Sequence, residues 1–326
     1  MRIITLEEHI SFPEMASQIP QEALSNFGKS PRMQQLLPLL EDITETRLDS
    51  MDRNGISIQV LSVDSAGANL LDATKGPAFA TKYNDLIAER IASHRHRFTA
   101  FAHLPMTAPA AAADELERAV NEYKFCGAMI RGLTQDRFLD HPMFGPIFER
   151  AEKLNVPLYI HPGIPPKGIA DIYYNNLSGK EEFVEALGCY GWGWHAETAL
   201  QVLRLFYAGI FDKYPKLKII IGHMGEMLPM MMVRSDRALS PGNGGANQRS
   251  LIDTFRAQVF VTTSGFFTQP PFRLALDTIG IDNLLFSVDY PFSTNEMGKE
   301  FLNNTGLSVA DQEKLKYKNA ERILRL

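Results

Sequence analysis

Short β-branched runs alternate with helical patterns along the chain, and no other feature constrains the fold as strongly. Eight runs with strand character are predicted, at residues 1–9, 56–63, 97–104, 126–133, 156–160, 217–222, 258–263 and 284–288. Helical patterns follow them at residues 41–54, 77–94, 109–123, 142–154, 195–211, 226–237, 272–279, 295–302 and 308–324. Strands that alternate with helices form parallel sheets, and eight such units close into a (β/α)8 TIM barrel. A doubly wound open sheet is the alternative, but no glycine-rich GxGxxG turn follows the first strand.

A single barrel domain is expected to span residues 1–326, because 45% of the residues are hydrophobic and no linker interrupts the pattern. Two long stretches, residues 10–40 and 164–194, contain polar residues with prolines or glycines and no sustained strand or helix period. Long loops in compact domains are usually functional. Both stretches are therefore predicted to be insertions at the C-terminal mouth of the barrel or at an interface.

Charge and composition exclude several classes of partner. The net charge is −5 with both signs interspersed, and no basic block or basic-aromatic stripe indicates a nucleic-acid surface. No apolar run is long enough to span a membrane or to serve as a secretory signal. The two cysteines, Cys126 and Cys189, do not form a CxxC pair and suit a reducing compartment. We expect a cytoplasmic protein that acts on small molecules.

Five residues with metal-binding or acid-base side chains fall at predicted strand ends, where a TIM barrel carries its active site. They are Glu7, His9, His161, His223 and Asp289. The first two lie two positions apart, so their side chains share one face of the strand. The chain has only eight histidines, and three of them occupy these few positions. Carboxylates and imidazoles together suit one divalent transition metal, Zn²⁺ or Mn²⁺, better than they suit all-oxygen Mg²⁺ or Ca²⁺.

Aromatic residues are concentrated in the predicted mouth loops, where they could enclose a planar ring or pack against a neighbouring subunit. They are Trp192, Trp194, Phe266, Phe267, Tyr290 and Phe292. His195 begins a predicted helix directly after this tryptophan pair, in a segment that could cover the barrel mouth. Barrels with such insertions commonly associate, so a homodimer or homotetramer is expected.

Four of the strand-end stretches carry a family resemblance. They read Leu6-Glu7-Glu8-His9, Tyr159-Ile160-His161-Pro162, Ile221-Gly222-His223-Met224-Gly225-Glu226-Met227-Leu228-Pro229, and Phe286-Ser287-Val288-Asp289-Tyr290-Pro291-Phe292. They resemble the motifs of the amidohydrolase-related, metal-dependent decarboxylases, a family that includes the γ-resorcylate, 2,3-dihydroxybenzoate and 5-carboxyvanillate enzymes and, more distantly, aminocarboxymuconate semialdehyde decarboxylase. The likeness covers nearly the whole chain.

The resemblance implies a non-oxidative decarboxylase of an ortho-hydroxy aromatic acid, with one divalent metal and no organic cofactor. It implies that the metal ligands are Glu7, His9, His161 and Asp289. It also implies that Asp289 protonates the ring carbon and that His223 and Glu226 form a hydrogen-bonded pair behind the site. The candidate contacts to substrate are Arg131, Arg234, Tyr290 and Phe292. Glu226 could instead complement a helix dipole, and Arg234 could form a salt bridge within the barrel wall.

The chain also departs from the family pattern. Arg131 ends the fourth strand where the γ-resorcylate enzymes have an asparagine, and Gly163 follows His161-Pro162 where they have a polar residue. A guanidinium in place of an amide favours a more anionic ligand. Two alternatives therefore remain: a mononuclear metal-dependent hydrolase of a lactone, ester or amide on the same site, and a binding barrel without catalysis.

Overall fold

The strands form a parallel barrel, as the alternation predicts. The computed structural model describes residues 2–20, 30–175 and 177–326. Its strands are β1 (Ile4–Ile10), β2 (Ile58–Val63), β3 (Phe98–Ala100), β4 (Ala102–His103), β5 (Ala128–Arg131), β6 (Pro157–His161), β7 (Lys218–Ile221), β8 (Val259–Thr262) and β9 (Leu284–Leu285). Neighbours pair in parallel in the orders β1-β2-β3 and β4-β5-β6-β7-β8-β9. Since β3 and β4 are one predicted strand interrupted at Phe101, the described residues supply all eight barrel strands.

The barrel closes between its first and last strands, and a side chain helps to join them. The backbone N–H of His9 donates to the carbonyl of Tyr290 at 2.7 Å. The buried Glu8 carboxylate accepts the backbone N–H groups of Val288 at 3.0 Å and of Tyr290 at 3.1 Å. Burial raises the pKa of Glu8 to about 7, although these two donors favour the charged form. Glu8 therefore adds side-chain hydrogen bonds to the backbone pairing along this seam.

A separate apolar cluster fills the inside of the barrel, and every barrel strand contributes to it. Its strand residues are Ile4, Leu6, Val60, Phe101, Met129, Tyr159, Ile220, Phe260 and Leu285. Ile323 and Leu324 of the last helix belong to the same cluster. The interior is thus a packed core, and polar chemistry is confined to the strand ends.

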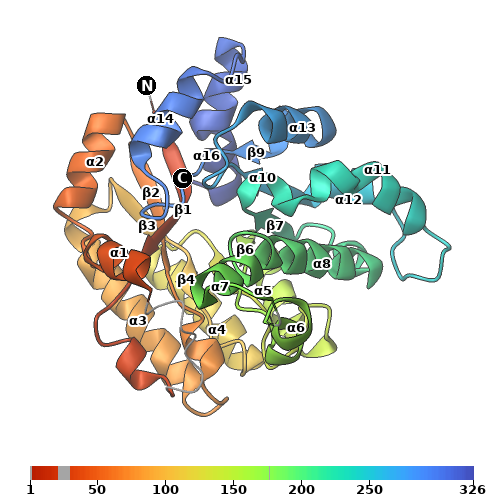
Figure 1. The fold of residues 1–326 in the computed structure, drawn as a ribbon, viewed down its shortest axis with the longest axis horizontal. Helices are drawn as coiled ribbons and strands as arrows, with labels where there is room; N and C mark the ends of the chain where they lie inside the picture. The colour runs from red at the N-terminus through yellow and green to blue at the C-terminus, as the bar shows by residue number, and fades with distance from the viewer. Residues whose placement is uncertain (1, 21–29, 176) are drawn as a thin grey trace.

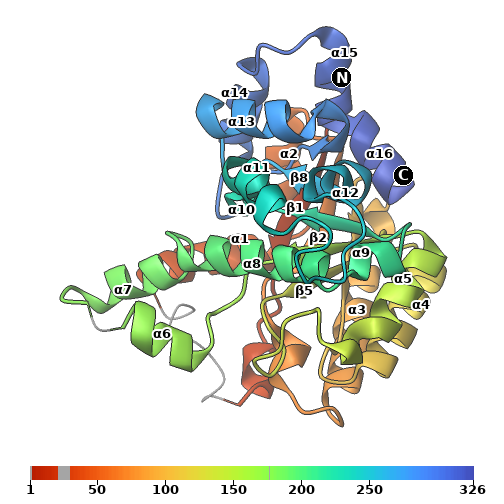
Figure 2. The same ribbon diagram turned by 90° about the vertical axis from the view of Figure 1, so that its right-hand side faces the viewer.

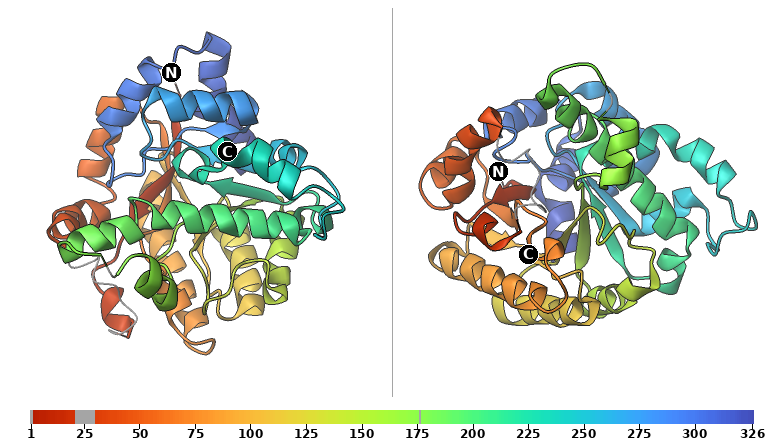
Figure 3. Two further views of the ribbon diagram at one scale, coloured as in Figure 1. Left: turned by 45° about the vertical axis from the view of Figure 1, so that its right-hand side comes forward. Right: turned by 60° about the horizontal axis from the view of Figure 1, so that its bottom comes forward.

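Helices surround the strands, as the views in Figure 1 and Figure 3 show. The longer ones are α1 (Pro31–Glu41), α2 (Thr46–Asn54), α3 (Gly76–Arg90), α4 (Pro109–Tyr123), α5 (Gly145–Leu154), α8 (Gly193–Tyr207), α11 (Leu228–Ala238), α12 (Leu251–Gln258), α13 (Gln269–Ile279) and α14 (Asn295–Asn303). Shorter ones are α6 (Lys167–Tyr173), α7 (Glu181–Gly188), α9 (Ile210–Lys213), α10 (His223–Glu226), α15 (Val309–Glu313) and α16 (Asn319–Leu324). No helix in the described parts of the chain is long and apolar enough to cross a membrane.

The two predicted insertions contain helices that the sequence pattern does not indicate. In the first, α1 carries an internal proline, Pro38, and is capped by Ser30, whose hydroxyl accepts from the N–H of Met33. The second contains α6 and α7, which extend away from the barrel beside α8 (Figure 2). Residues 21–29 and 176 of these insertions lie outside the described residues. The expectation that residues 10–40 form a long excursion before the first helix is wrong, because α1 begins within them and is capped by Ser30.

Candidate active site and metal centre

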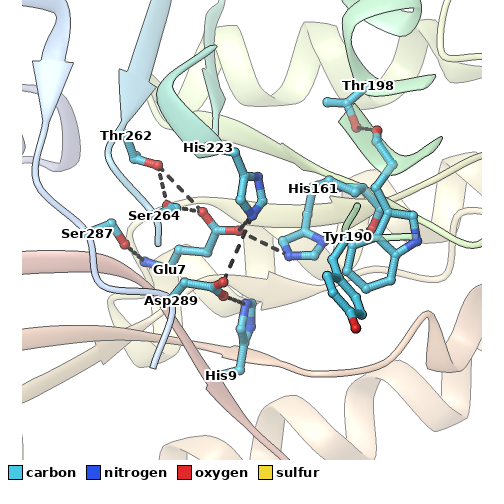
Figure 4. Close-up of polar contacts among 12 residues, drawn as sticks. Glu7, His9, His161, Tyr190, Thr198, His223, Thr262, Ser264, Ser287 and Asp289 are labelled. Atoms are coloured by element: carbon cyan, nitrogen blue, oxygen red, sulfur yellow. Dashed lines mark hydrogen bonds and ion pairs between the residues drawn. The ribbon is translucent and has the colours of Figure 1, made fainter. Parts of the chain in front are cut away.

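The five predicted strand-end side chains converge at one point above the barrel core (Figure 4). His161 Nε2 lies 3.1 Å from Glu7 Oε1, and His9 Nε2 lies 3.1 Å from Asp289 Oδ1. His223 Nε2 lies 3.7 Å from Glu7 Oε1 and 4.0 Å from Asp289 Oδ2. Parallel strands of a closed barrel bring residues together that are 282 positions apart in sequence.

Two buried polar atoms at this point have no hydrogen-bond partner: Glu7 Oε1 and His9 Nε2. The other oxygen of Glu7, Oε2, accepts hydrogen bonds from the hydroxyls of Tyr159 and Ser264, which fix the carboxylate. Buried polar atoms are rarely left without a partner. One possible metal-ligand atom from each of Glu7, His9 and His161 lies within 4.8 Å of the other two. The same holds for Glu7, His223 and Asp289. Lone pairs converging in this way fit a divalent cation.

The imidazole of His161 is held in the tautomer that a metal ligand needs. His161 Nδ1 lies 2.7 Å from the carbonyl oxygen of Pro162, which can only accept, so Nδ1 carries the proton and Nε2 has a free lone pair. His9 Nδ1 lies 3.0 Å from the hydroxyl of Ser62, which can donate or accept, and 2.9 Å from Nη2 of Arg131, which can only donate, so these contacts do not place a proton on Nδ1. Burial and the nearby Arg131 cation lower the pKa of both histidines, which keeps the rings neutral.

The two carboxylates at the centre have opposite pKa shifts. Burial alone would raise the pKa of Glu7, but His223 and the close His161 ring outweigh burial and hold the pKa well below its usual value. Burial and the negative charge of Glu7 raise the pKa of Asp289 well above its usual value. Close carboxylates that cannot both ionise divide into one base and one acid. Asp289 is therefore the group suited to hold a proton.

His223 belongs to a left-handed turn that aims it at this centre. The backbone φ angles are 48° at His223 and 53° at Glu226, and Asp289 has φ 69° at its own strand end. Non-glycine residues with positive φ are uncommon and often occur at functional sites. Glu226 Oε1 accepts from His223 Nδ1 at 2.7 Å, which leaves His223 Nε2 facing the centre. Burial opposes charge on His223, but Glu226 and Glu7 raise its pKa to about 10.

A cavity of about 170 Å³ opens above these residues. It is lined by His9, Arg32, Asp64, Arg131, His161, Tyr190, Trp194, His195, His223, Ser264, Gly265, Phe266, Asp289, Phe292 and Ser293. The ring of Phe292 lies 5.6 Å from that of His9, and the ring of Phe266 lies 6.0 Å from that of His223. Cavities of about this size take up a benzene molecule. The centre thus has room beside it for one aromatic ring.

Comparison with known proteins agrees with this geometry. The family described as amidohydrolase matches residues 36–326. The chain belongs to the amidohydrolase family. It is similar to the gamma-resorcylate decarboxylase of Rhizobium sp. (35% identity, covering 99% of this chain and 98% of that one). A solved 2,6-dihydroxybenzoate decarboxylase complexed with 2,6-dihydroxybenzoate matches with a TM-score of 0.90 and 35% identity, covering 100% of both chains.

A second solved structure, the dihydroxybenzoic acid decarboxylase of Polaromonas sp. with bound manganese and the inhibitor 2-nitroresorcinol, matches with a TM-score of 0.88 and 34% identity. The match covers 99% of this chain and 97% of the Polaromonas chain. The resemblance to metal-dependent decarboxylases and the predicted TIM-barrel class are both confirmed.

Two of the four predicted substrate contacts of this amidohydrolase do not line the cavity. Tyr290 is buried beside the seam, and its ring packs against the guanidinium of Arg47 at 4.6 Å. Its neighbour Asp289 lines the cavity, whereas the Tyr290 ring turns towards Arg47. Arg234 lies exposed on α11 and does not reach the cavity of its own chain. Phe292 does line the cavity.

Arg131 lines the cavity and is anchored from below. Its Nε donates to the carbonyl of Val63 at 3.0 Å, and Nη2 lies 3.5 Å from Asp64 Oδ1. Nη1 lies 3.0 Å from Nδ1 of His161, a nitrogen that already carries a proton. Nη2 also lies 2.9 Å from Nδ1 of His9, so the guanidinium contacts both predicted histidine ligands and lines the cavity.

Gly163 has a packing role in this amidohydrolase. A Cβ at this position would lie 2.4 Å from Cα of Gly132, so only glycine lets the ends of β5 and β6 approach this closely. The departure from the family pattern at Gly163 is explained by this contact between two backbones.

The sequence reasoning missed three functional candidates. Tyr159 lies two residues before His161 on β6, so strand alternation already places both side chains on one face. Ser264 stands at the predicted end of the seventh barrel strand. His195 Nδ1 lies 2.5 Å from Glu226 Oε2, a contact that joins two helices and that no local pattern could reveal.

Proposed function

We propose that this amidohydrolase is a metal-dependent, non-oxidative decarboxylase of an ortho-hydroxybenzoate-type acid such as 2,6-dihydroxybenzoate. Four proposed ligands hold one divalent transition metal, Mn²⁺ or Zn²⁺: Glu7, His9, His161 and Asp289. One observation supports this most directly. Glu7 Oε1 and His9 Nε2 are buried and lack hydrogen-bond partners, and His9 lines a cavity sized for one aromatic ring. Relatives at 34–35% identity that carry manganese or a dihydroxybenzoate in their solved structures support the same activity.

When bound, the metal stabilises negative charge on the carboxylate and the adjacent phenolic oxygen of the substrate. Asp289 is the proposed proton donor, because burial and Glu7 favour its protonated form. The carboxyl proton of Asp289 moves to the ring carbon that carries the carboxylate. The bond from that carbon to the carboxylate then breaks, its electron pair restores the aromatic ring, and carbon dioxide leaves. Water returns a proton to Asp289.

Other residues orient the substrate. His223 presents Nε2 to the cavity and is held through Nδ1 by Glu226, so it can donate to an oxygen of the bound acid. Arg131 supplies a cation for an anionic substituent. Phe292 and Phe266 provide apolar walls that exclude water.

The test combines metal analysis with product analysis. We expect purified protein reconstituted with Mn²⁺ to release carbon dioxide from ortho-hydroxybenzoates. Asp289→Asn should lower kcat at least about 100-fold, the usual scale of general acid catalysis. Glu7→Gln should lose metal. Asp140→Asn, which removes a carboxylate paired with Arg204 at 2.8 Å on the surface, is the matched control. Cleavage of lactones without gas release would instead support the hydrolase alternative.

We also propose that the protein is a cytoplasmic homodimer or homotetramer. Exposed apolar side chains on α11 support association, among them Met230 (74% exposed) and Val233 (69%). Ile172 and Tyr173 on α6 add a second exposed apolar group on the projecting insertion. Light scattering after gel filtration measures the assembly, and the double variant Met230→Lys with Val233→Lys should shift it towards the monomer. Both cysteines are free thiols, which suits a reducing compartment.

A further inference from the structure

Glu226 lies between two imidazoles, and only one of them faces the cavity centre. Its Oε1 bonds to Nδ1 of His223 at 2.7 Å and its Oε2 to Nδ1 of His195 at 2.5 Å. All three side chains are buried. Within residues 2–20, 30–175 and 177–326, these two histidines are the only hydrogen-bond donors to the Glu226 carboxylate. The orientation of Glu226 therefore depends on His195 as much as on His223.

The hydrogen-bond partners of His195 determine where its protons lie. Nε2 lies 3.0 Å from the carbonyl oxygen of Tyr190, which can only accept, so Nε2 donates. Burial alone would raise the pKa of Glu226, but His223 and His195 outweigh burial and lower it, so the carboxylate is ionised. Nδ1 of His195 then donates as well. His195 is fixed at both ring nitrogens, by a backbone carbonyl on one side and by Glu226 on the other.

The hydrogen bond from His195 holds Glu226 in an orientation that the backbone around Glu226 does not impose by itself. Glu226 and His223 stand in a turn with positive φ, outside any regular helix that could orient them. A carboxylate held by one donor can rotate about its last side-chain bond, whereas one held at both oxygens cannot. With Oε2 fixed on His195, Oε1 stays on Nδ1 of His223, and Nε2 of His223 stays directed at the cavity.

We propose that His195 is a positioning residue for the decarboxylation: through Glu226 it fixes the orientation of His223, and it links the 164–194 insertion to that histidine. The inference rests on the proposed function. The link runs through Tyr190, which lines the cavity, and whose ring also contacts the guanidinium of Arg32 on α1 at 5.3 Å. Segments from both insertions thus meet at the residue that anchors His195.

Two amide variants separate the two contacts of His195. In His195→Asn the side-chain NH2 lies near the former Nδ1, so the donor to Glu226 is kept and the donor to Tyr190 is lost. In His195→Gln the NH2 lies near the former Nε2, so the donor to Tyr190 is kept and the donor to Glu226 is lost. We expect His195→Gln to lower kcat about 10- to 100-fold, the scale of a lost hydrogen bond to a charged group, with KM changed less than about 3-fold. His195→Asn should keep kcat within about 3-fold of wild type.

Thr198→Val is the matched control, because Thr198 lies one turn further along α8 and bonds only to the carbonyl of Trp194 at 2.8 Å. It should leave kcat unchanged. If His195→Gln folds poorly, His195→Leu takes its place in the test. Leucine fills a similar volume and has neither donor, so His195→Leu should show the same loss of kcat. Equal kcat values for His195→Gln, His195→Leu and wild type would overturn the proposal.

A spectroscopic measurement separates this inference from the proposed function. In metal-free protein labelled with ¹⁵N-histidine, the proton of His223 Nδ1 bonded to Glu226 should give a downfield signal. His195→Asn should retain this signal, and His195→Gln should shift it or broaden it by exchange. An unchanged signal in His195→Gln refutes the positioning role. If wild-type enzyme releases no carbon dioxide from any ortho-hydroxybenzoate, the proposed function fails, and the spectra still decide whether His195 orients His223.

Discussion

The hydroxyl of Tyr159 bonds to Oε2 of Glu7, and the other oxygen of the same carboxylate, Oε1, has no hydrogen-bond partner. Tyr159 thus orients Glu7 so that one oxygen is fixed and the other is available to a cation. The hydroxyl is itself held by Thr262 Oγ1 at 2.8 Å. Partners of this kind orient metal ligands and contribute to affinity without touching the metal.

Tyr159→Phe should therefore weaken Mn²⁺ binding about 10- to 100-fold while the fold remains intact. Calorimetric titration of metal-free protein measures the affinity. Tyr214→Phe is the matched control, since it also removes a phenol hydroxyl, one bonded to the carbonyl of Gly145 at 3.4 Å outside the cavity. Equal affinities of Tyr159→Phe and wild type would show that the tyrosine does not orient Glu7.

Glu8→Gln should destabilise the barrel without removing the metal. The carboxylate accepts the N–H groups of Val288 and Tyr290, and an amide in its place points NH2 towards one of these donors. One unsatisfied buried donor costs about 1–3 kcal/mol of unfolding free energy. Urea unfolding measures this loss, and metal analysis should give the wild-type content. Glu313→Gln, at an exposed pair with Lys318, is the control and should not change stability measurably. A loss of metal with unchanged stability would contradict the assignment of Glu8 to the seam.

The strand-end residues could be predicted from the sequence because β-branched runs alternate with helical patterns along the chain. β-branched runs locate the strands, and closure of the barrel then brings Glu7, His161 and Asp289 to one place without further information. The pairing of His195 with Glu226 could not be predicted, because it depends on how the start of α8 packs over a left-handed turn.

The failures have equally local causes. Tyr290 is predicted to contact the substrate, but Asp289 has a positive φ, and the turn after it directs the Tyr290 ring towards Arg47. The helix of residues 31–41 begins after the capping hydroxyl of Ser30, which an apolar period does not report.

His103 should make folding stability fall as the pH falls. Burial, with a smaller contribution from Arg131, lowers its pKa to about 4. The unfolded chain, with a pKa near 6.5, then binds more protons than the folded one between about pH 6.5 and 4. The stabilisation is fully present above pH 6.5, and about 3 kcal/mol of it is lost as the pH falls to 4.

His103→Gln tests this, since its carbonyl oxygen can still accept the N–H of Ala68, which His103 Nε2 accepts at 3.0 Å, but it cannot titrate. Urea unfolding of metal-free protein at several pH values between 7.5 and 4.5 should show the stability of wild type falling relative to the variant. Parallel pH curves for the two proteins would exclude His103 as the titrating group.

Arg131 should set the preference for anionic substituents on the substrate ring. Its guanidinium is anchored by Val63 and Asp64 and lines the cavity. Arg131→Asn should lower kcat/KM about 10- to 100-fold for a hydroxybenzoate with a second carboxylate, the scale of one charged hydrogen bond, and less for one with a second hydroxyl. The kcat/KM of Arg131→Lys should lie between the values of wild type and Arg131→Asn, because an ammonium keeps the charge but lacks the planar pair of donors.

Metal content must be measured in each Arg131 variant, since the guanidinium lies beside His9 and His161. Arg97→Asn, which removes a surface arginine paired with Asp52 at 2.7 Å, is the control and should leave both substrates unaffected. An equal loss for both substrates with full metal content would mean that Arg131 supports the two histidines and does not select the substituent. A larger loss for the dicarboxylate would identify Arg131 as the residue that selects the anionic substituent.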